Sequence, residues 1–304
     1  MAMCVSSQVT EAAAVLRSML SDYRTAHPAD GCYGEDHAGL WARLDADDWL
    51  TAADPVDGDT VGLRSLAELA EAWGSTLIPL PFVETLLVRR QSAAFRAAGP
   101  TGRMATFALP AAGRRLAWPF GSSRGTERVL PGGGSEPALE AGQGEIDLFA
   151  PSLPVTMTAG NSAQVMPDIV PDALALYAAT AVGSASATLQ LAIAHAKRRE
   201  AFGQVIVKFQ AMRHRLADMH RDLELARTAA YWACQPTADR IRAARLGADL
   251  ARQVTEGAVQ IHGGMGFTWD LGLHYNMRHI MVVRKLITGV LQADADSAAT
   301  GRDE

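Results

Sequence analysis

The sequence predicts an α+β fold in three parts: a helical domain at residues 1–98, a reduced β domain at 99–165 and an antiparallel four-helix bundle at 166–304. Apolar residues recur at helical spacing through most of the first part and again through the last. Between them, glycine, proline and serine become frequent and the apolar runs shorten to strand length. The chain has 304 residues, 48% of them hydrophobic, which is enough to bury a core across several subdomains.

The first part is expected to form four helices. In the first, Leu16 and Leu20 share an apolar face, and His27-Pro28 ends the pattern. Trp41 and Trp73 lie on the apolar faces of the second and third helices, where core packing explains them. Pro79-Leu-Pro81 suits the start of the fourth, since proline is tolerated in a first helical turn. The expected bounds are 8–26, 36–46, 62–75 and 79–95.

The middle part is expected to be a small block of short strands between turns. The expected strands are Met104–Leu109, Arg115–Trp118, Arg128–Leu130, Ile146–Phe149 and Val155–Met157. The run Pro131-Gly-Gly-Gly-Ser135 is glycine-rich, but no strand leads into a helix there. We therefore expect a flexible loop at this point and no phosphate cradle.

The last part is expected to form four long helices with short connections, which is typical of an antiparallel bundle. Pro236 separates the second from the third. Small residues in the first, among them Ala181, Gly183 and Ser184, allow another helix to approach closely. Asp172 lies near the start of this helix, where a carboxylate favours the helix dipole. The expected bounds are 170–199, 204–234, 238–262 and 271–292.

Charge and cysteine content exclude several classes of protein. A net charge of −5 argues against a nucleic-acid surface, which needs a concentrated basic face. Cys4, Cys32 and Cys234 are far apart and odd in number, so we expect neither a metal site nor a disulfide framework. The N-terminus resembles no signal peptide, and the alanine-rich run 173–194 reads better as a buried helix than as a membrane span. The expected location is the cytoplasm.

Two stretches of the bundle have the composition of an anion site. The first, Arg199-Glu-Ala-Phe-Gly-Gln-Val-Ile-Val-Lys-Phe-Gln210, places an arginine and a glutamine beside a Phe-Gly turn. A guanidinium can meet a phosphate with two parallel hydrogen bonds. The second, Gln260-Ile-His-Gly-Gly-Met-Gly-Phe267, removes side chains from one spot so that backbone N–H groups can approach an anion. It is no P-loop, because no Gly-Lys-Ser/Thr follows.

Together, Arg-x-x-Phe-Gly with Gln210 and the later Gln-x-x-Gly-Gly-x-Gly resemble the C-terminal domain of the acyl-CoA dehydrogenase family. The resemblance continues through Leu216-Ala-Asp-Met219 and Leu273-His-Tyr-x-x-Arg278, and it covers about residues 170–292. A looser resemblance covers 36–91, at Leu40-Trp41, Leu66-Ala-Glu-Leu-Ala-Glu-Ala-Trp73 and Pro79-Leu-Pro-Phe-Val-Glu-Thr85. The order of helices, short β block and four-helix bundle also matches that family's fold.

The resemblance implies that FAD lies across a subunit interface, with the flavin ring held by one subunit and the adenosine–diphosphate end by its neighbour's bundle. It implies that Arg199 pairs with the pyrophosphate, that Phe202 packs near the cofactor and that Gln210 supports the arginine. The other cofactor-binding residues that it implies are Gln260, Gly263, Gly264 and Gly266. His262 is expected to be a structural histidine beside a turn.

The groups that perform the family's chemistry are absent from the matching positions. The family's base, which removes the α-proton of the acyl thioester, would fall at Ile287 or at Ala173, and neither side chain takes a proton. Asp172 is the remaining candidate base, although one helical step turns a side chain by about 100°. The family's flavin-ring motifs, Thr-Glu-Pro…Gly-Ser-Asp and Trp-Ile-Thr-Asn, are also missing, and the apolar Ala105-Thr-Phe-Ala-Leu-Pro110 stands near the first.

These features lead us to expect a short subunit of an FAD-dependent acyl-CoA dehydrogenase of the heteromeric (α2β2) type. Its partner, a second acyl-CoA dehydrogenase chain, would supply the base and the flavin-ring site for desaturation of an acyl-CoA. Three alternatives remain open: a self-sufficient homodimeric dehydrogenase that uses Asp172, a non-catalytic scaffold of the same fold, and a related flavoprotein oxidase or monooxygenase.

Overall fold

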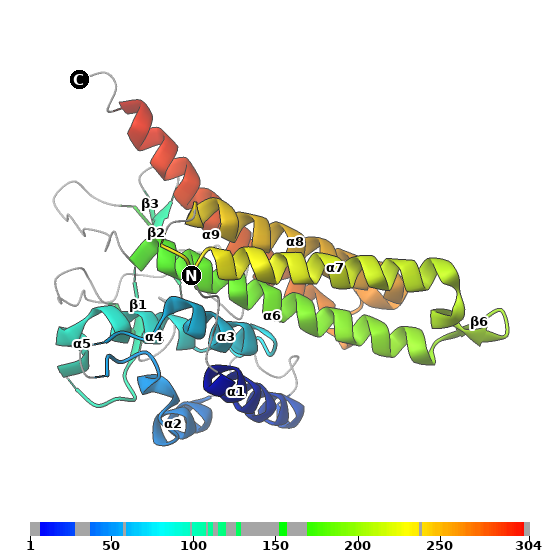
Figure 1. Ribbon diagram of the computed structural model, residues 1–304, viewed down its shortest axis with the longest axis horizontal. Helices are drawn as coiled ribbons and strands as arrows, with labels where there is room; N and C mark the ends of the chain where they lie inside the picture. The colour runs from blue at the N-terminus through cyan, green and yellow to red at the C-terminus, as the bar shows by residue number, and fades with distance from the viewer. Residues whose placement is uncertain are drawn as a thin grey trace.

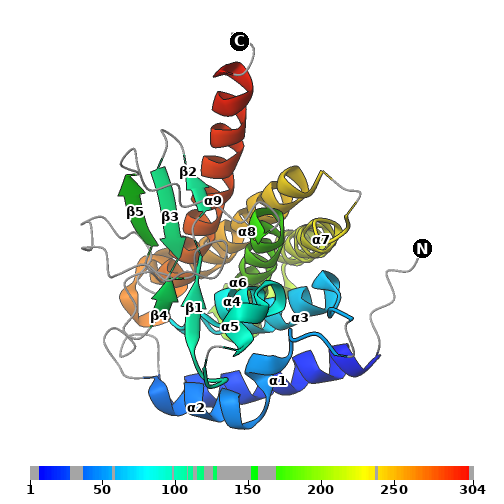
Figure 2. The same ribbon diagram turned by 90° about the vertical axis from the view of Figure 1, so that its left-hand side faces the viewer.

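The computed structural model describes residues 7–27, 37–56, 59–97, 99–107, 109–111, 115–119, 126–128, 152–156, 169–236 and 239–300. A long helical bundle dominates it, with shorter helices along one side and the small strands near one end (Figure 1). The strand block faces the viewer in Figure 2, where the last part of the C-terminal helix extends past the bundle.

The four expected bundle helices are confirmed, although the last continues to Thr300, past its expected end at 292. They are α6 (Ile169–Arg198), α7 (Gln210–Trp232), α8 (Arg240–His262) and α9 (Leu273–Thr300). The expected start of the second helix at 204 is wrong by six residues, because the chain first makes a short hairpin and the 3₁₀ turn η3 (Ile206–Lys208). The hairpin forms since Phe202 and Gly203 both have positive φ, which an α-helix does not accept.

Helix α6 is the central helix of the fold, and small residues let α3 (Leu63–Gly74) cross it closely. A Cβ placed on Gly183 would lie 1.9 Å from the Glu71 carbonyl oxygen, and one on Gly74 would lie 2.1 Å from the Thr180 carbonyl oxygen. The expected close approach at Gly183 is therefore confirmed. By length and composition alone α6 is also the one described helix that could cross a membrane, but most of its apolar window is buried inside the fold.

The N-terminal helices lie close to their expected bounds. They are α1 (Ser7–Ala26), α2 (Ala38–Ala46), α3, α4 (Phe82–Gln91) and α5 (Ala93–Ala97), with the 3₁₀ turn η2 (Trp49–Thr51) after α2. The fourth expected helix is broken in two at Ser92. The hydroxyl of Ser92 accepts a hydrogen bond from the Phe95 N–H at 3.1 Å, so this serine acts as the cap of a new short helix.

The middle segment forms short strands in two small sheets. The expected single strand Met104–Leu109 is wrong, because its two ends belong to different sheets. Strand β1 (Met104–Thr106) pairs in parallel with β4 (Thr126–Arg128). Strands β2 (Leu109–Ala111), β3 (Arg115–Pro119) and β5 (Ser152–Thr156) form an antiparallel sheet in that order (Figure 2). The expected strand Ile146–Phe149 and the expected loop Pro131–Ser135 lie outside the described residues.

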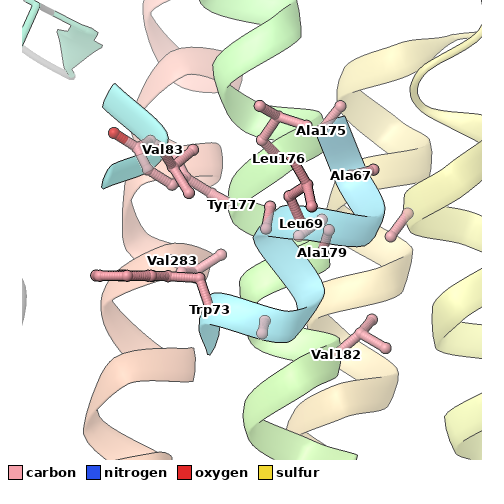
Figure 3. Close-up of a cluster of buried hydrophobic side chains, with 14 of the residues drawn as sticks. Ala67, Leu69, Trp73, Val83, Ala175, Leu176, Tyr177, Ala179, Val182 and Val283 are labelled. Carbon is pink, nitrogen blue, oxygen red and sulfur yellow. The ribbon is translucent and has the colours of Figure 1, made fainter. Parts of the chain in front are cut away.

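One core joins the N-terminal helices to the bundle. Trp73 of α3 is 5% exposed and stacks on Phe82 of α4 with ring centroids 4.5 Å apart. Figure 3 shows Leu69 of α3 beside Leu176 of α6, and Trp73 of α3 beside Val283 of α9. Trp41 and Trp73 are core residues, as expected, and the division at residues 98 and 165 stays a prediction.

Candidate functional site

The turn that contains the Phe-Gly pair is a two-residue β-hairpin at the far end of the bundle (Figure 1). Strands β6 (Glu200–Ala201) and β7 (Gln204–Val205) pair on either side of it. Phe202 has φ 52° and Gly203 has φ 79°, the signs that a type I′ turn requires at both central positions. The Ile206 N–H donates to the Arg199 carbonyl at 2.8 Å, which closes the base of the hairpin.

Arg199 begins this hairpin with its guanidinium unpaired. It is exposed, and among the described residues it makes no side-chain hydrogen bond or ion pair. Gln210 is also exposed and begins α7, whose capping residue, Phe209, provides no side-chain hydrogen bond. The first N–H groups of a helix carry partial positive charge and favour a nearby anion. Arg199 and the α7 N-terminus are thus two positive features at one turn.

The glycine loop forms the 3₁₀ turn η4 (Gly263–Phe267) directly after α8. Gly263 has φ 62°, and a Cβ on Gly263 or on Gly264 would meet no heavy atom within 4 Å. Gly266 differs, because its Cβ would lie 2.5 Å from the Val259 carbonyl oxygen. Gly263 and Gly264 therefore leave open backbone that a ligand could approach, whereas Gly266 is required for packing within this chain.

The hairpin and the glycine loop meet through two histidine rings. His195, in the last turn of α6, lies with its ring centroid 4.5 Å from that of His262, the last residue of α8. The Arg199 N–H donates to the His195 carbonyl at 2.8 Å. His262 is buried, and its Nδ1 donates to the Ala258 carbonyl at 2.8 Å, which fits the expected structural role. The remaining predicted residue, Gln260, is exposed one turn before the loop.

Large apolar side chains are exposed around these segments. Phe202 is 96% exposed at the hairpin turn and contacts the ring of Phe209 edge-on, at 6.3 Å between centroids. Met265, Phe267 and Trp269 are 54%, 74% and 61% exposed in and after the glycine loop. Exposed apolar surface of this kind is characteristic of an interaction site.

The two positions that correspond to the family's base are buried, one at the opposite end of α6 and the other in α9. Ala173 and Ile287 are both fully buried. Asp172 is 7% exposed and lies between two arginines, 3.0 Å from Arg90 and 2.5 Å from Arg240. A carboxylate held by two guanidinium groups is stabilised in its charged form and anchors α4 and α8 to α6. The geometry therefore favours a structural role for Asp172.

A buried acid that sequence reasoning missed lies near this end of α6. Glu84 of α4 is 1% exposed, and burial raises the pKa of its carboxyl to about 7, although the Tyr177 hydroxyl opposes that shift. Burial also raises the pKa of Tyr177, as does the nearby Glu84. Figure 3 shows Tyr177 reaching from α6 toward Val83 of α4. Within the described residues, neither Glu84 Oε1 nor the Tyr177 hydroxyl has a hydrogen-bond partner of normal geometry.

A second missed feature is a charged cavity of about 520 Å³ between α1, α3, α6 and α7. The polar side chains that line it form hydrogen bonds with one another. Arg227 donates to both oxygens of Glu71, at 3.0 and 3.2 Å, and the Tyr231 hydroxyl donates to Glu71 at 2.5 Å. The Arg64 guanidinium covers the Tyr231 ring at 3.3 Å. The apolar spacing of α3 predicted the helix but gave no signal for this network, because its partners come from α7.

The hairpin end of the bundle fits the phosphate part of an anionic nucleotide. It presents an unpaired guanidinium, an uncapped helix N-terminus and open glycine backbone, which are the groups that bind phosphates in proteins. Among the described residues no cluster of histidine, cysteine and carboxylate side chains could hold a metal ion. The arrangement can therefore bind and orient an anionic ligand.

Comparison with known sequences agrees with this reading. Residues 175–287 match the family described as "Acyl-CoA dehydrogenase, C-terminal domain". The chain is 40% identical over 111 residues to the acyl-CoA dehydrogenase IpdE2 of Mycobacterium tuberculosis, over 36% of this chain and 35% of that protein. It is 37% identical over 114 residues to the short-chain specific acyl-CoA dehydrogenase of Megasphaera elsdenii, over 35% and 30% of the two chains. The chain thus matches about a third of the length of these relatives.

Comparison with solved structures extends over the whole chain. The ChsE4–ChsE5 complex from Mycobacterium tuberculosis aligns with a TM-score of 0.73 and 19% identity, covering 100% of this chain and 98% of the other. The Tcur3481–Tcur3483 steroid ACAD G363A variant aligns with a TM-score of 0.72 and 21% identity, covering 98% and 99%. The chain has the acyl-CoA dehydrogenase fold, and residues 175–287 of its bundle match the C-terminal domain of the acyl-CoA dehydrogenase family.

Proposed function

We propose that this chain is a subunit of an FAD-dependent acyl-CoA dehydrogenase that completes the adenosine–pyrophosphate half of the FAD site for a second, unlike chain. The partner contributes the catalytic base and holds the flavin ring, and the mixed enzyme desaturates an acyl-CoA thioester between its α and β carbons. FAD supplies the hydride acceptor when bound. The residues of this chain bind and orient the cofactor: Arg199, Phe202, Gln210, Gln260, Gly263, Gly264 and, through packing, Gly266.

One observation carries the proposal. The groups suited to a pyrophosphate are exposed and unpaired among the described residues, while both base positions, Ala173 and Ile287, are filled by buried apolar side chains. Arg199 has no anionic partner within the described residues, and the ring of Phe202 beside it is 96% exposed. A bound phosphate would pair with Arg199, and the surface of a partner chain would cover Phe202.

The comparisons support both parts of the proposal. Two of the similar structures are complexes of two named components, ChsE4 with ChsE5 and Tcur3481 with Tcur3483. Another, with a TM-score of 0.71, is PigA with FAD and proline, in which FAD is bound to this fold. An α2β2 assembly is the arrangement that we expect for the pair.

The test is to express the chain alone, and together with a second, unlike acyl-CoA dehydrogenase chain as candidate partner, sought first among the genes that neighbour its own. We expect the purified pair to carry stoichiometric FAD by its visible absorbance, and each chain alone to lack it. A yellow chain on its own whose activity is lost in Asp172→Ala would favour the self-sufficient dehydrogenase. A pair that forms without flavin would favour the scaffold.

Matched variants locate the pyrophosphate in the pair. Arg199→Ala removes a charge-assisted contact and should weaken FAD binding by about 10- to 100-fold. Arg198→Ala removes the neighbouring exposed arginine and serves as its control. Gly264→Val should also release FAD, since its side chain has room in this chain and would occupy only the ligand's space. Full retention of FAD after Arg199→Ala would contradict this placement.

A further inference from the structure

The two histidines that join the hairpin to the glycine loop occupy an unusual electrostatic position. Each lies in the last turn of its helix, His195 in α6 and His262 in α8, at the negative end of the helix dipole. Partial burial lowers the pKa of the His195 ring, together with the charges of His262, Arg199 and Arg198. The protonation of His195 therefore depends on the charges placed around it.

The position of one ring proton of the buried partner is fixed by a hydrogen bond. A carbonyl can only accept, so the contact between His262 and the Ala258 oxygen places a proton on His262 Nδ1. His262 is thereby oriented with its ring against His195, at 4.5 Å between centroids. His195 is the less buried ring of the pair, so solvent can reach it.

No carboxylate among the described residues is paired with these rings. The charges that act on His195 are the cations of its own helix end and His262 from α8. The neighbouring hairpin, η3 and first turns of α7 add exposed side chains, mostly cationic. These are Glu200, Lys208, Arg213, His214 and Arg215. An anion bound between Arg199 and the glycine loop would thus be the main negative charge near His195.

We propose that His195 is a proton-linked residue of the nucleotide site, which takes up a proton when the pyrophosphate binds between the Arg199 hairpin and the glycine loop. This inference rests on the proposed function. His195 acts as a positioning residue: it joins the two binding segments through His262, and its charge supports the anion. The proton comes from solvent, and no covalent step is involved.

The linkage between proton uptake and FAD binding sets the direction of the pH dependence. A bound dianion favours the imidazolium, so the complex binds more protons than the free site, and FAD binds more tightly as the pH falls. The dissociation constant should rise by up to about tenfold per pH unit across the range in which His195 titrates, and level off above it. In the free site the pKa of the His195 ring lies below its usual 6.5. We therefore expect the pH dependence of FAD binding near and below neutral pH.

The experiment measures FAD affinity of the assembled pair by flavin fluorescence from pH 5.5 to 8.5. His195→Gln should remove most of the pH dependence and bind FAD at every pH as weakly as the wild type does at high pH. His195→Lys carries a permanent charge, so it should bind tightly with little pH dependence. His262→Gln removes a repulsive neighbour and should shift the midpoint to higher pH, a change that lost packing alone would not produce.

Calorimetry in buffers of different ionisation heat gives a second readout, because proton uptake changes the observed heat of FAD binding. A wild-type pH dependence that persists in His195→Gln, or a binding heat that is independent of buffer, would overturn the assignment of His195. This failure is distinct from failure of the proposed function, which would appear as a pair that forms without flavin or as a chain that binds FAD alone.

Discussion

The two ends of helix α6 contrast sharply. At its start, Asp172 is held between Arg90 and Arg240, and Ala173 is buried against other core side chains. At its end, about 40 Å away by helical rise, Arg199 is exposed and unpaired among the described residues. The polar groups at the start are satisfied within this chain, whereas those at the end are not. We therefore expect the binding site at the Arg199 end of α6, where charged and apolar side chains are exposed.

The largest expected effect tests the closed end. Asp172→Ala leaves two partly buried arginines without their anion, and breaking such a pair should lower the free energy of unfolding by about 3 kcal/mol. Arg199→Ala, at the open end, should change it by less than about 0.5 kcal/mol. Urea denaturation of the isolated chain measures both. Unchanged stability in Asp172→Ala, with activity of the pair abolished, would instead make Asp172 a functional group.

A second prediction concerns Glu84, whose carboxyl has a pKa of about 7 when folded and an ordinary value of 4.5. The folded state holds this proton more tightly, so its contribution to stability is complete below pH 4.5 and is lost as the pH rises through 7. The loss should be about 3 kcal/mol in total. Glu84→Gln should remove that slope, which denaturation at pH 5.5 and pH 8 would show. An identical slope in both proteins would mean that Glu84 ionises normally.

The third prediction separates two glycines of one loop. Gly266→Ala forces a Cβ against the Val259 carbonyl and should lower the unfolding free energy by about 1–3 kcal/mol. Gly264→Ala has open space and should leave the stability of the isolated chain nearly unchanged. Thermal melts of both variants provide the comparison. Equal destabilisation would show that the loop at Gly264 is packed and not available to a ligand.

The smallest expected effect is at the hairpin turn. Phe202 has positive φ, which costs a bulky residue about 1 kcal/mol, and its ring is almost fully exposed. Phe202→Asn accepts this backbone and should raise the unfolding free energy of the isolated chain by about 0.5–1 kcal/mol. The same variant should form less of the mixed complex on size exclusion. A variant that loses stability without weakening the complex would assign Phe202 to the fold of this chain.

Helix periodicity and small-residue patterns predicted most of the described fold, because those signals are local. The bundle helices, the close approach at Gly183 and the core positions of Trp41 and Trp73 all follow from residue spacing. The break at Ser92 was missed because a serine cap competes with a continuous apolar pattern. The start of α7 differs from the expected one because Gln204–Val205 pairs as a strand and Phe209 is extended, and the apolar spacing of the sequence does not show either feature.

The sequence by itself determined which residues have the chemistry of a phosphate site, since Arg-x-x-Phe-Gly and the glycine run are local patterns. Only the tertiary structure decided that these segments meet through His195 and His262, and that Gly266 packs while Gly264 stays open. It also decided that Asp172 is bound by arginines from two other helices and that Glu84 is buried opposite Tyr177. The reason is physical: contacts, burial and pKa depend on neighbours that are distant in the chain.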